Sequence, residues 1–279
     1  IANGDTVILK PNLVGTGGKV PEVNGVTTDY RVVRAVAQLV RELNPDGYIA
    51  ILEGSHELTK DVYPDMNYTS EFIPEVDDIL PLMDESGDWG DYDSPNLVAK
   101  VLPDSLRLYP DSKKPNKSPE IYQSRLYYNA DAVISIPVLK NHDRGQVTVA
   151  IKNVGIGATP PSIYGDGWNG DDQEAGPQAG AGDGFDQKRP NNRNPGISHD
   201  LPYLQYWIHD FYLARPVDFA IMDGLQGIQM GPGAHMGSLR SCQKNMRLIL
   251  ASHYPISMDV LEALIMGHDP AKISHLSTL

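Results

Sequence analysis

The feature that most constrains the fold is a strand, a helix and a second strand within the first 53 residues. Residues 5–10 form a short apolar run closed by Pro11-Asn12, and Tyr48–Glu53 form another. Between the two runs, N-cap residues at Thr27–Asp29 precede apolar residues that recur at helical spacing over 32–43. A strand–helix–strand unit with short links normally implies a right-handed crossover between parallel strands. The sequence therefore predicts a parallel sheet.

The rest of the chain extends this pattern. We expect strands at Ala132–Ile136, Gln146–Ile151, Val217–Met222 and Met246–Ala251, and helices at His199–Leu213 and Ile256–Met266. The sum predicts an α/β fold: a layered, mostly parallel open sheet with helices on both faces, with a long irregular insertion. We interpret residues 1–279 as a single α/β domain with a peripheral excursion at 60–130. Residues 157–198, rich in Gly, Asp, Asn, Pro and Gln, are predicted to be a long loop that covers the site as a lid.

Composition excludes several classes of function. The formal net charge of −13 argues against nucleic acid as a partner, because neutralising phosphates requires a basic surface. No apolar run approaches the roughly 20 residues that a membrane span needs. Cys242 is the single cysteine, which excludes an internal disulfide and an iron–sulfur cluster ligated by cysteines of this chain alone. Frequent Tyr and sparse Lys favour an exported protein over a cytoplasmic one, and a first residue other than Met leads us to expect a removed leader.

Polar residues gather where the predicted strands end. In open α/β sheets, ligands bind outside the carboxyl ends of the strands. The segments found there are Lys10-Pro11-Asn12, Glu53-Gly54-Ser55-His56, Lys140-Asn141-His142-Asp143, Lys152-Asn153 and Asp223-Gly224. Their lysines, histidines and carboxylates exceed what structural turns require, so we expect Lys10, His56, His142 and Lys152 to line one cleft at the same edge of the sheet.

The leading hypothesis is an enzyme with an acid–base site formed by His56, His142 and Lys152. Histidines move protons near neutral pH because their ordinary pKa is about 6.5. A partly desolvated Lys152 would serve as a Schiff base, an oxyanion partner or a cofactor anchor. A small anionic, carboxylate-type molecule would be bound by the remaining polar groups, which are Lys10, Asn12, Glu53, Lys140 and Asn153. The cofactor is left open, with a divalent metal held by His142, His199 and Asp223 as one candidate.

Structural interpretations stand beside these roles. Lys152 is also compatible with a structural ion pair, His56 with a cap, and Asp223-Gly224 with a plain turn. The other histidines are most simply surface or satisfied core residues; they are His209, His253, His268 and His275. No phosphate-binding loop, nucleophile elbow or H-E-x-x-H zinc motif is present in the sequence.

Several motifs resemble the family called domain of unknown function 362. The motifs, in chain order, are Val7–Leu13, Thr27–Asp29, Glu53–Ser55, Ile136–His142, Ala150–Asn153 and Met222–Gly224 with Gly231-Pro232. The resemblance runs from residue 5 to about residue 270. The family has no settled activity. Some members are joined to ferredoxin-like clusters or carry export signals. This sequence shows neither feature, so an electron-transfer role is unsupported here.

A more distant likeness is to the amino-terminal domain of nickel-pincer lactate racemases. That family has a strand followed by Gly-Thr-His, then a second His, and a cofactor-bearing Lys ten residues later. His56 follows Gly54-Ser55 here, and His142 precedes Lys152 by ten. The resemblance implies that the two histidines form the acid–base pair and that Lys152 anchors the cofactor. The racemase's nickel-ligating His falls on Trp168 here, with His199 as the nearest substitute, and its Asp and Arg after the first strand correspond to Pro11-Asn12.

Three classes of function follow. The first is an enzyme, of a racemase- or isomerase-like or a redox type. The second is a binding protein without chemistry that holds an anion or a metal. The third is a module completed by a redox partner. The sequence leaves the substrate, the metal and the oligomeric state open.

Overall fold

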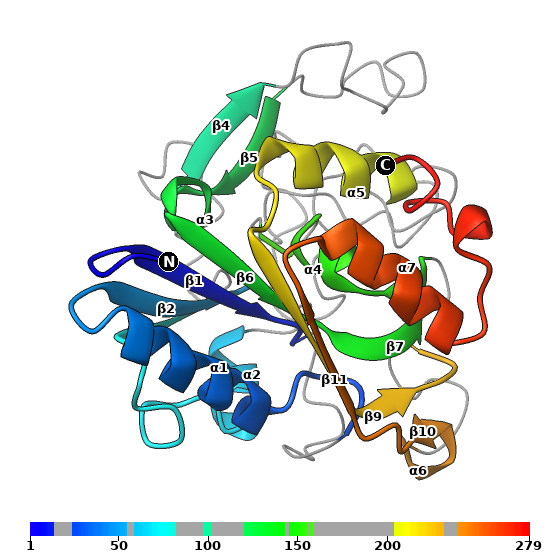
Figure 1. Ribbon diagram of the computed structural model, residues 1–279, viewed down its shortest axis with the longest axis horizontal. Helices are drawn as coiled ribbons and strands as arrows, with labels where there is room; N and C mark the ends of the chain where they lie inside the picture. Colours follow the sequence, from blue (N-terminus) through cyan, green and yellow to red (C-terminus); the bar gives the residue numbers. More distant parts are fainter. Residues whose placement is uncertain are drawn as a thin grey trace.

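The computed structural model describes nine parts of the chain (Figure 1). They are residues 1–13, 24–54, 59–81, 97–101, 120–142, 145–155, 157–158, 204–231 and 239–279.

The predicted strand–helix–strand unit forms the first part of the sheet. β1 (Thr6–Pro11) pairs in parallel with β2 (Tyr48–Glu53), and α1 (Tyr30–Leu43) connects them. Asp29 caps α1 by accepting the backbone N–H of Arg31 at 2.9 Å.

Within the described residues, a sheet of nine strands runs in the order β3-β2-β1-β6-β9-β7-β8, with β10 and β11 paired to β9. The parallel members are completed by β3 (Asp78–Pro81), β6 (Ala132–Ile136), β9 (Phe219–Ile228) and β7 (Val138–His142). Three short strands pair antiparallel: β8 (Gln146–Thr148), β10 (Gln243–Lys244) and β11 (Leu248–Ser252). β4 (Leu97–Val101) and β5 (Glu120–Ser124) form a separate antiparallel pair.

Helices cover both faces of this sheet, as Figure 1 shows. On one face, α1 and α2 (Thr59–Asp65) pack their apolar side chains against Val7 and Leu9 of β1. On the other, α4 (Ala150–Gly155), α5 (Leu204–Ala214) and α7 (Pro255–Ile265) pack around Ile8. Three single-turn elements complete the fold: α3 (Arg125–Asn129), α6 (Leu239–Cys242) and the 3-10 helix η4 (Pro270–Lys272). The predicted fold class is confirmed.

The predicted strand over residues 146–151 is wrong in its second half. β8 ends at Thr148, and Ala150 begins α4, so Lys152 and Asn153 lie on a helix and not at a strand end. The physical reason is a cap supplied by another element. The carboxylate of Asp259 on α7 accepts the backbone N–H groups of Ala150 and Ile151 at 2.9 and 3.0 Å.

Two other predicted segments differ in extent. β9 continues to Ile228 through Asp223, which was expected to follow the strand. Residues 59–81 belong to the expected peripheral excursion, yet α2 and β3 pack on the main sheet, and Tyr63 and Ile73 join its core. The predicted loop at 157–198 lies outside the described residues, except for residues 157 and 158.

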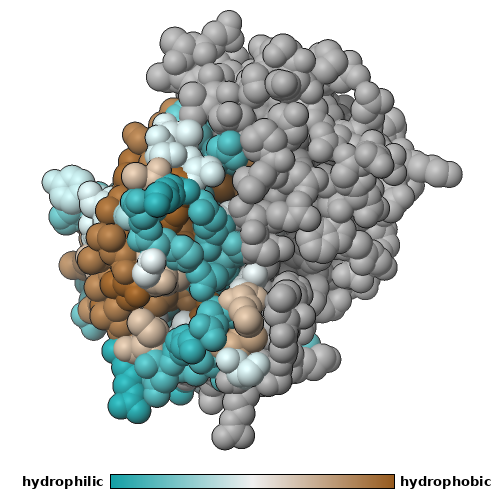
Figure 2. All heavy atoms as spheres, turned by 90° about the vertical axis from the view of Figure 1, so that its right-hand side faces the viewer, coloured by the Kyte–Doolittle hydropathy of each residue, from teal (hydrophilic) through white to brown (hydrophobic). Residues whose placement is uncertain are grey.

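The outer surface of α7 is apolar. Leu261 and Leu264 are 46% and 56% exposed, and Ile249 on the neighbouring β11 is also exposed. Figure 2 shows hydrophobic side chains on this side of the molecule. The helices of the described residues are all too short or too polar to cross a membrane.

Candidate functional site

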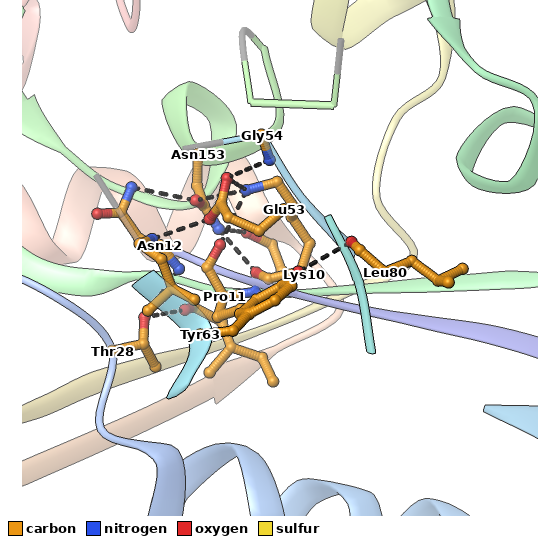
Figure 3. Close-up of polar contacts among 12 residues, drawn as sticks. Lys10, Pro11, Asn12, Thr28, Glu53, Gly54, Tyr63, Leu80 and Asn153 are labelled. Atoms are coloured by element: carbon orange, nitrogen blue, oxygen red, sulfur yellow. Dashed lines mark hydrogen bonds and ion pairs between the residues drawn. The ribbon is translucent and has the colours of Figure 1, made fainter. Parts of the chain in front are cut away.

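Lys10 and Glu53 form a buried ion pair at adjoining ends of two parallel strands. Lys10 precedes the last residue of β1, and Glu53 ends β2. Lys10 Nζ lies 2.8 Å from Glu53 Oε1 and 2.8 Å from the carbonyl oxygen of Pro11 (Figure 3). The Glu53 carboxylate also accepts the backbone N–H groups of Leu13 and Gly54, each at 2.8 Å. Both charged groups are therefore fixed in place by hydrogen bonds. They are also buried, since only 1% of Lys10 and 3% of Glu53 is exposed.

Two asparagines complete this arrangement. Asn153 Oδ1 accepts hydrogen bonds from Asn12 Nδ2 at 3.2 Å and from Lys10 Nζ at 3.4 Å. Asn153 Nδ2 donates to the Lys10 carbonyl oxygen and to Ser135 Oγ, which ties α4 to β1 and β6. The Asn12 Oδ1 atom is buried and accepts no hydrogen bond from the described residues. We call Lys10, Asn12, Glu53 and Asn153 the Lys10 cluster.

Lys140 adds a second fully buried ammonium group. Its side chain is 0% exposed, and Nζ donates to the carbonyl oxygen of Val26 at 2.6 Å. Burial is the main cause that lowers the pKa of Lys140 well below its usual range; nearby Lys152 and Lys10 lower it further, while Glu53 opposes them. Burial likewise lowers the pKa of Lys10, against the opposing effect of Glu53. The three lysines therefore share one electrostatic environment with Glu53.

His142 and Lys152 meet at the turn that joins β7 to β8. The backbone N–H of Gly145 donates to His142 Nδ1 at 3.0 Å, so a neutral His142 carries its proton on Nε2. Lys152 lies against the same turn, because a Cβ atom added to Gly145 would come within 3.1 Å of Lys152 Cε. Only 8% of His142 and 9% of Lys152 is exposed.

His275 joins this group from the C-terminal segment. The neighbouring Ser274 N–H donates to Gln146 Oε1 at 3.2 Å, and Gln146 is the direct cross-strand partner of His142. His275 is 1% exposed, and its Nε2 atom has no hydrogen-bond partner among the described residues. Burial, followed by the charges of Lys152 and His142, lowers the pKa of His275 to about 3.

Asp223 lies in the interior of β9. Its Oδ2 accepts the backbone N–H of Asp29 at 2.7 Å, and its Oδ1 accepts that of Leu225 at 3.1 Å. Burial raises the pKa of Asp223 to about 6 despite these two bonds.

The other predicted residues, His56 and His199, lie outside the described residues. The residues that are described contain no group of three His, Cys, Asp or Glu side chains able to hold a metal. The metal site and the single cleft stay predictions.

The structure thus brings most of the predicted site residues into two adjoining groups. The members of the Lys10 cluster are in direct contact, and the charges of Lys152, Glu53 and Lys10 all act on the pKa of Lys140. Sequence reasoning missed the place of His275, because no local pattern marks it and the contact that ties its segment to β8 joins residues 128 positions apart. Neutral histidine and a lysine of lowered pKa are groups that can transfer protons or act as nucleophiles near neutral pH.

The chain matches a family model and resembles a solved structure. The family model described as Domain of unknown function (DUF362) matches residues 98–263. Among solved structures, the lactate racemase apoprotein from Thermoanaerobacterium thermosaccharolyticum matches with a TM-score of 0.46 and 10% sequence identity. The match covers 92% of this chain and 48% of that chain, so this chain spans about half the length of that structure. A search of curated proteins gave no significant match.

Proposed function

The chain belongs to the DUF362 family, and from that premise we propose that it is an enzyme that binds a small carboxylate and transfers a proton with His142 and Lys152. The role of His56 in the same acid–base site is part of this proposal.

The observation that carries the proposal is a buried lysine, Lys140, for which the described residues supply no carboxylate partner and whose pKa burial lowers. Lys10 is neutralised by Glu53, whereas Lys140 donates to a backbone carbonyl group and forms no ion pair with the described residues. Buried ammonium groups are costly unless an anion compensates them. A small carboxylate would supply that charge and accept charge-assisted hydrogen bonds, which are about twice as strong as neutral ones. The acidic surface of the chain does not oppose this, since a local cationic site still attracts an anion.

The Lys10 cluster would orient the ligand. Glu53 and Asn153 hold Lys10 and Asn12 in place by hydrogen bonds, so these groups need no rearrangement when a ligand arrives. Asn12 Oδ1, which accepts no hydrogen bond from the described part of the chain, is an acceptor that suits a ligand hydroxyl group. The cluster therefore supports recognition of a carboxylate that bears a second polar group.

Proton transfer would fall to His142. Neutral His142 carries its proton on Nε2, so as a base it takes up a further proton on Nδ1, once the hydrogen bond from the Gly145 N–H opens. Lys152, on α4, would hold the carboxylate or stabilise negative charge that develops beside it. A divalent metal held by His142, His199 and Asp223 remains a separate proposal, and neither step depends on it.

The test uses three two-carbon carboxylates: acetate, glycolate and glyoxylate. We expect the wild type to bind at least one of them in calorimetry and to exchange the carbon-bound protons of glycolate in D₂O, followed by NMR. Lys152→Ala should weaken binding by about tenfold or more, the equivalent of about 1.4 kcal/mol. His142→Ala should slow exchange by about 100-fold or more, the usual contribution of a general base.

Lys272→Ala is the matched control, because the Lys272 side chain is 80% exposed, and it should leave both measurements unchanged. Binding without exchange would identify a non-catalytic anion-binding protein, the second function that the buried lysines support. Absence of both in the wild type would contradict the proposal, also when divalent metals are added.

A further inference from the structure

We propose that His275 is a ligand-binding residue of this site, and that its Nε2 atom donates a hydrogen bond to an oxygen atom of the bound carboxylate. This inference rests on the proposed function, since it assigns a further group to the same site.

The first observation is an unsatisfied atom. Buried side-chain nitrogens in native proteins nearly always have a hydrogen-bond partner, and an exception calls for a specific explanation. His275 Nε2 is buried and has no hydrogen-bond partner in the described part of the chain. A ligand oxygen would satisfy it.

The second observation is the fixed position of the backbone around His275. Ile273 and Leu276, on either side of His275, belong to the same core cluster as Val147 and Ile151. The Ser274 N–H is bonded to Gln146, and the His275 carbonyl oxygen accepts a hydrogen bond from Thr278 Oγ1 at 3.1 Å. These contacts hold the backbone of His275 beside β8.

The third observation concerns the residues near His275. Burial lowers the pKa of His275 far below the ordinary value, and the nearby charges of Lys152 and His142 lower it further. A neutral imidazole beside an ammonium group contributes an N–H donor without adding charge. Lys152 would then neutralise the carboxylate, while His275 would fix the direction in which it lies.

The test compares His275→Phe and His275→Gln with the wild type, using acetate, glycolate and glyoxylate in calorimetry. His275→Phe keeps a ring of similar shape but removes both nitrogens, so affinity for the carboxylate that binds the wild type should fall at least about tenfold. His275→Gln retains an amide N–H and should recover most of that loss. In ¹⁵N NMR, the wild-type His275 Nε2 signal should shift when the carboxylate is added. The control is His253→Phe, because His253 is exposed on the loop before α7.

Unchanged affinity in a folded His275→Phe variant would overturn the inference while leaving the proposed function intact. If His275→Phe does not fold, an Nε2 signal that fails to move in the wild type would overturn it in the same way. If the wild type binds none of the three carboxylates, the proposed function fails and the inference fails with it.

Discussion

At the scale of single residues, the Lys10–Glu53 pair is the interaction on which the site most depends. Removing one partner of a buried ion pair leaves an uncompensated charge and costs about 3–5 kcal/mol. We therefore expect Glu53→Gln to lower the free energy of unfolding by roughly that amount, measured by urea denaturation. The change also replaces one of the two oxygens that accept the backbone N–H groups of Gly54 and Leu13, which adds to the loss.

Glu75→Gln provides the comparison, since Glu75 pairs with the 43% exposed side chain of Arg34. Ion pairs of this kind contribute about 0–1 kcal/mol, so the second variant should remain close to the wild type. Equal losses of unfolding free energy in the two variants would mean that the buried pair stabilises the fold no more than the exposed pair does.

The proximity of Lys10 and Glu53 follows from the sequence, whereas the surroundings of Lys152 and Asn153 do not. Lys10 and Glu53 end strands whose apolar runs are unambiguous, and the carboxyl ends of parallel strands meet at one edge. Lys152 follows a run rich in β-branched residues, which is typical of a strand. The cap from Asp259 decides otherwise, and an interaction over more than 100 residues leaves no local trace in the sequence.

At the scale of elements, α7 has an unusual distribution of polarity. Its leucines at positions 261 and 264 are exposed, whereas Asp259 and Glu262 are 0% exposed. Asp259 is accounted for by its two hydrogen bonds to α4, yet neither carboxyl oxygen of Glu262 has a hydrogen-bond partner among the described residues. Burial raises the pKa of Asp259 to about 8 and that of Glu262 well above its ordinary range. Glu262 is therefore expected to keep its proton in the folded protein at pH values at which an ordinary glutamate has lost it.

This protonation predicts a pH dependence with a definite sign. Above the ordinary glutamate pKa of about 4.3, the unfolded chain releases the proton that folded Glu262 retains, so this group contributes less stability as pH rises, by up to about 1.4 kcal/mol per pH unit until the folded pKa is reached. Gln cannot titrate. The free energy of unfolding of Glu262→Gln, relative to the wild type, should therefore increase between pH 5 and pH 9 in urea denaturation.

Asp259 contributes to this pH dependence, because its charge helps to raise the pKa of Glu262. Glu71→Gln, on the exposed surface, should run parallel to the wild type over the same range. A difference between Glu262→Gln and the wild type that does not change with pH would show that Glu262 is ionised in the folded protein.

At the scale of the whole molecule, one sheet connects two layers of core. Successive residues of β1 face opposite sides: Val7 and Leu9 pack with α1, and Ile8 packs with the helices of the other face. The parallel character of this sheet followed from the first 53 residues, since strand, helix and strand leave few alternatives. The strand order did not follow from the sequence. β9 lies between β6 and β7 in the sheet although it comes after both in the chain, and no local pattern indicates this pairing.

Because both layers share β1, β2 and β6, we expect the 279-residue chain to unfold as one cooperative unit, in keeping with the single domain predicted from the sequence. Val33→Ala, on α1, and Val154→Ala, on α4, remove equal volumes from the opposite layers, where both side chains are 0% exposed. Each should lower the same transition by about 1–3 kcal/mol, between the typical costs of smaller and larger core truncations. The two sites share no contact across the sheet, so the double variant should lose the sum of the two values within about 0.5 kcal/mol. Leu39→Ala, at a 59% exposed position of α1, is the control for altered helix content.

Far-UV circular dichroism and fluorescence should give coincident urea transitions for all variants. Two separated transitions, one moved by each substitution, would instead divide the chain into two units, with the Lys10 cluster on the boundary between them.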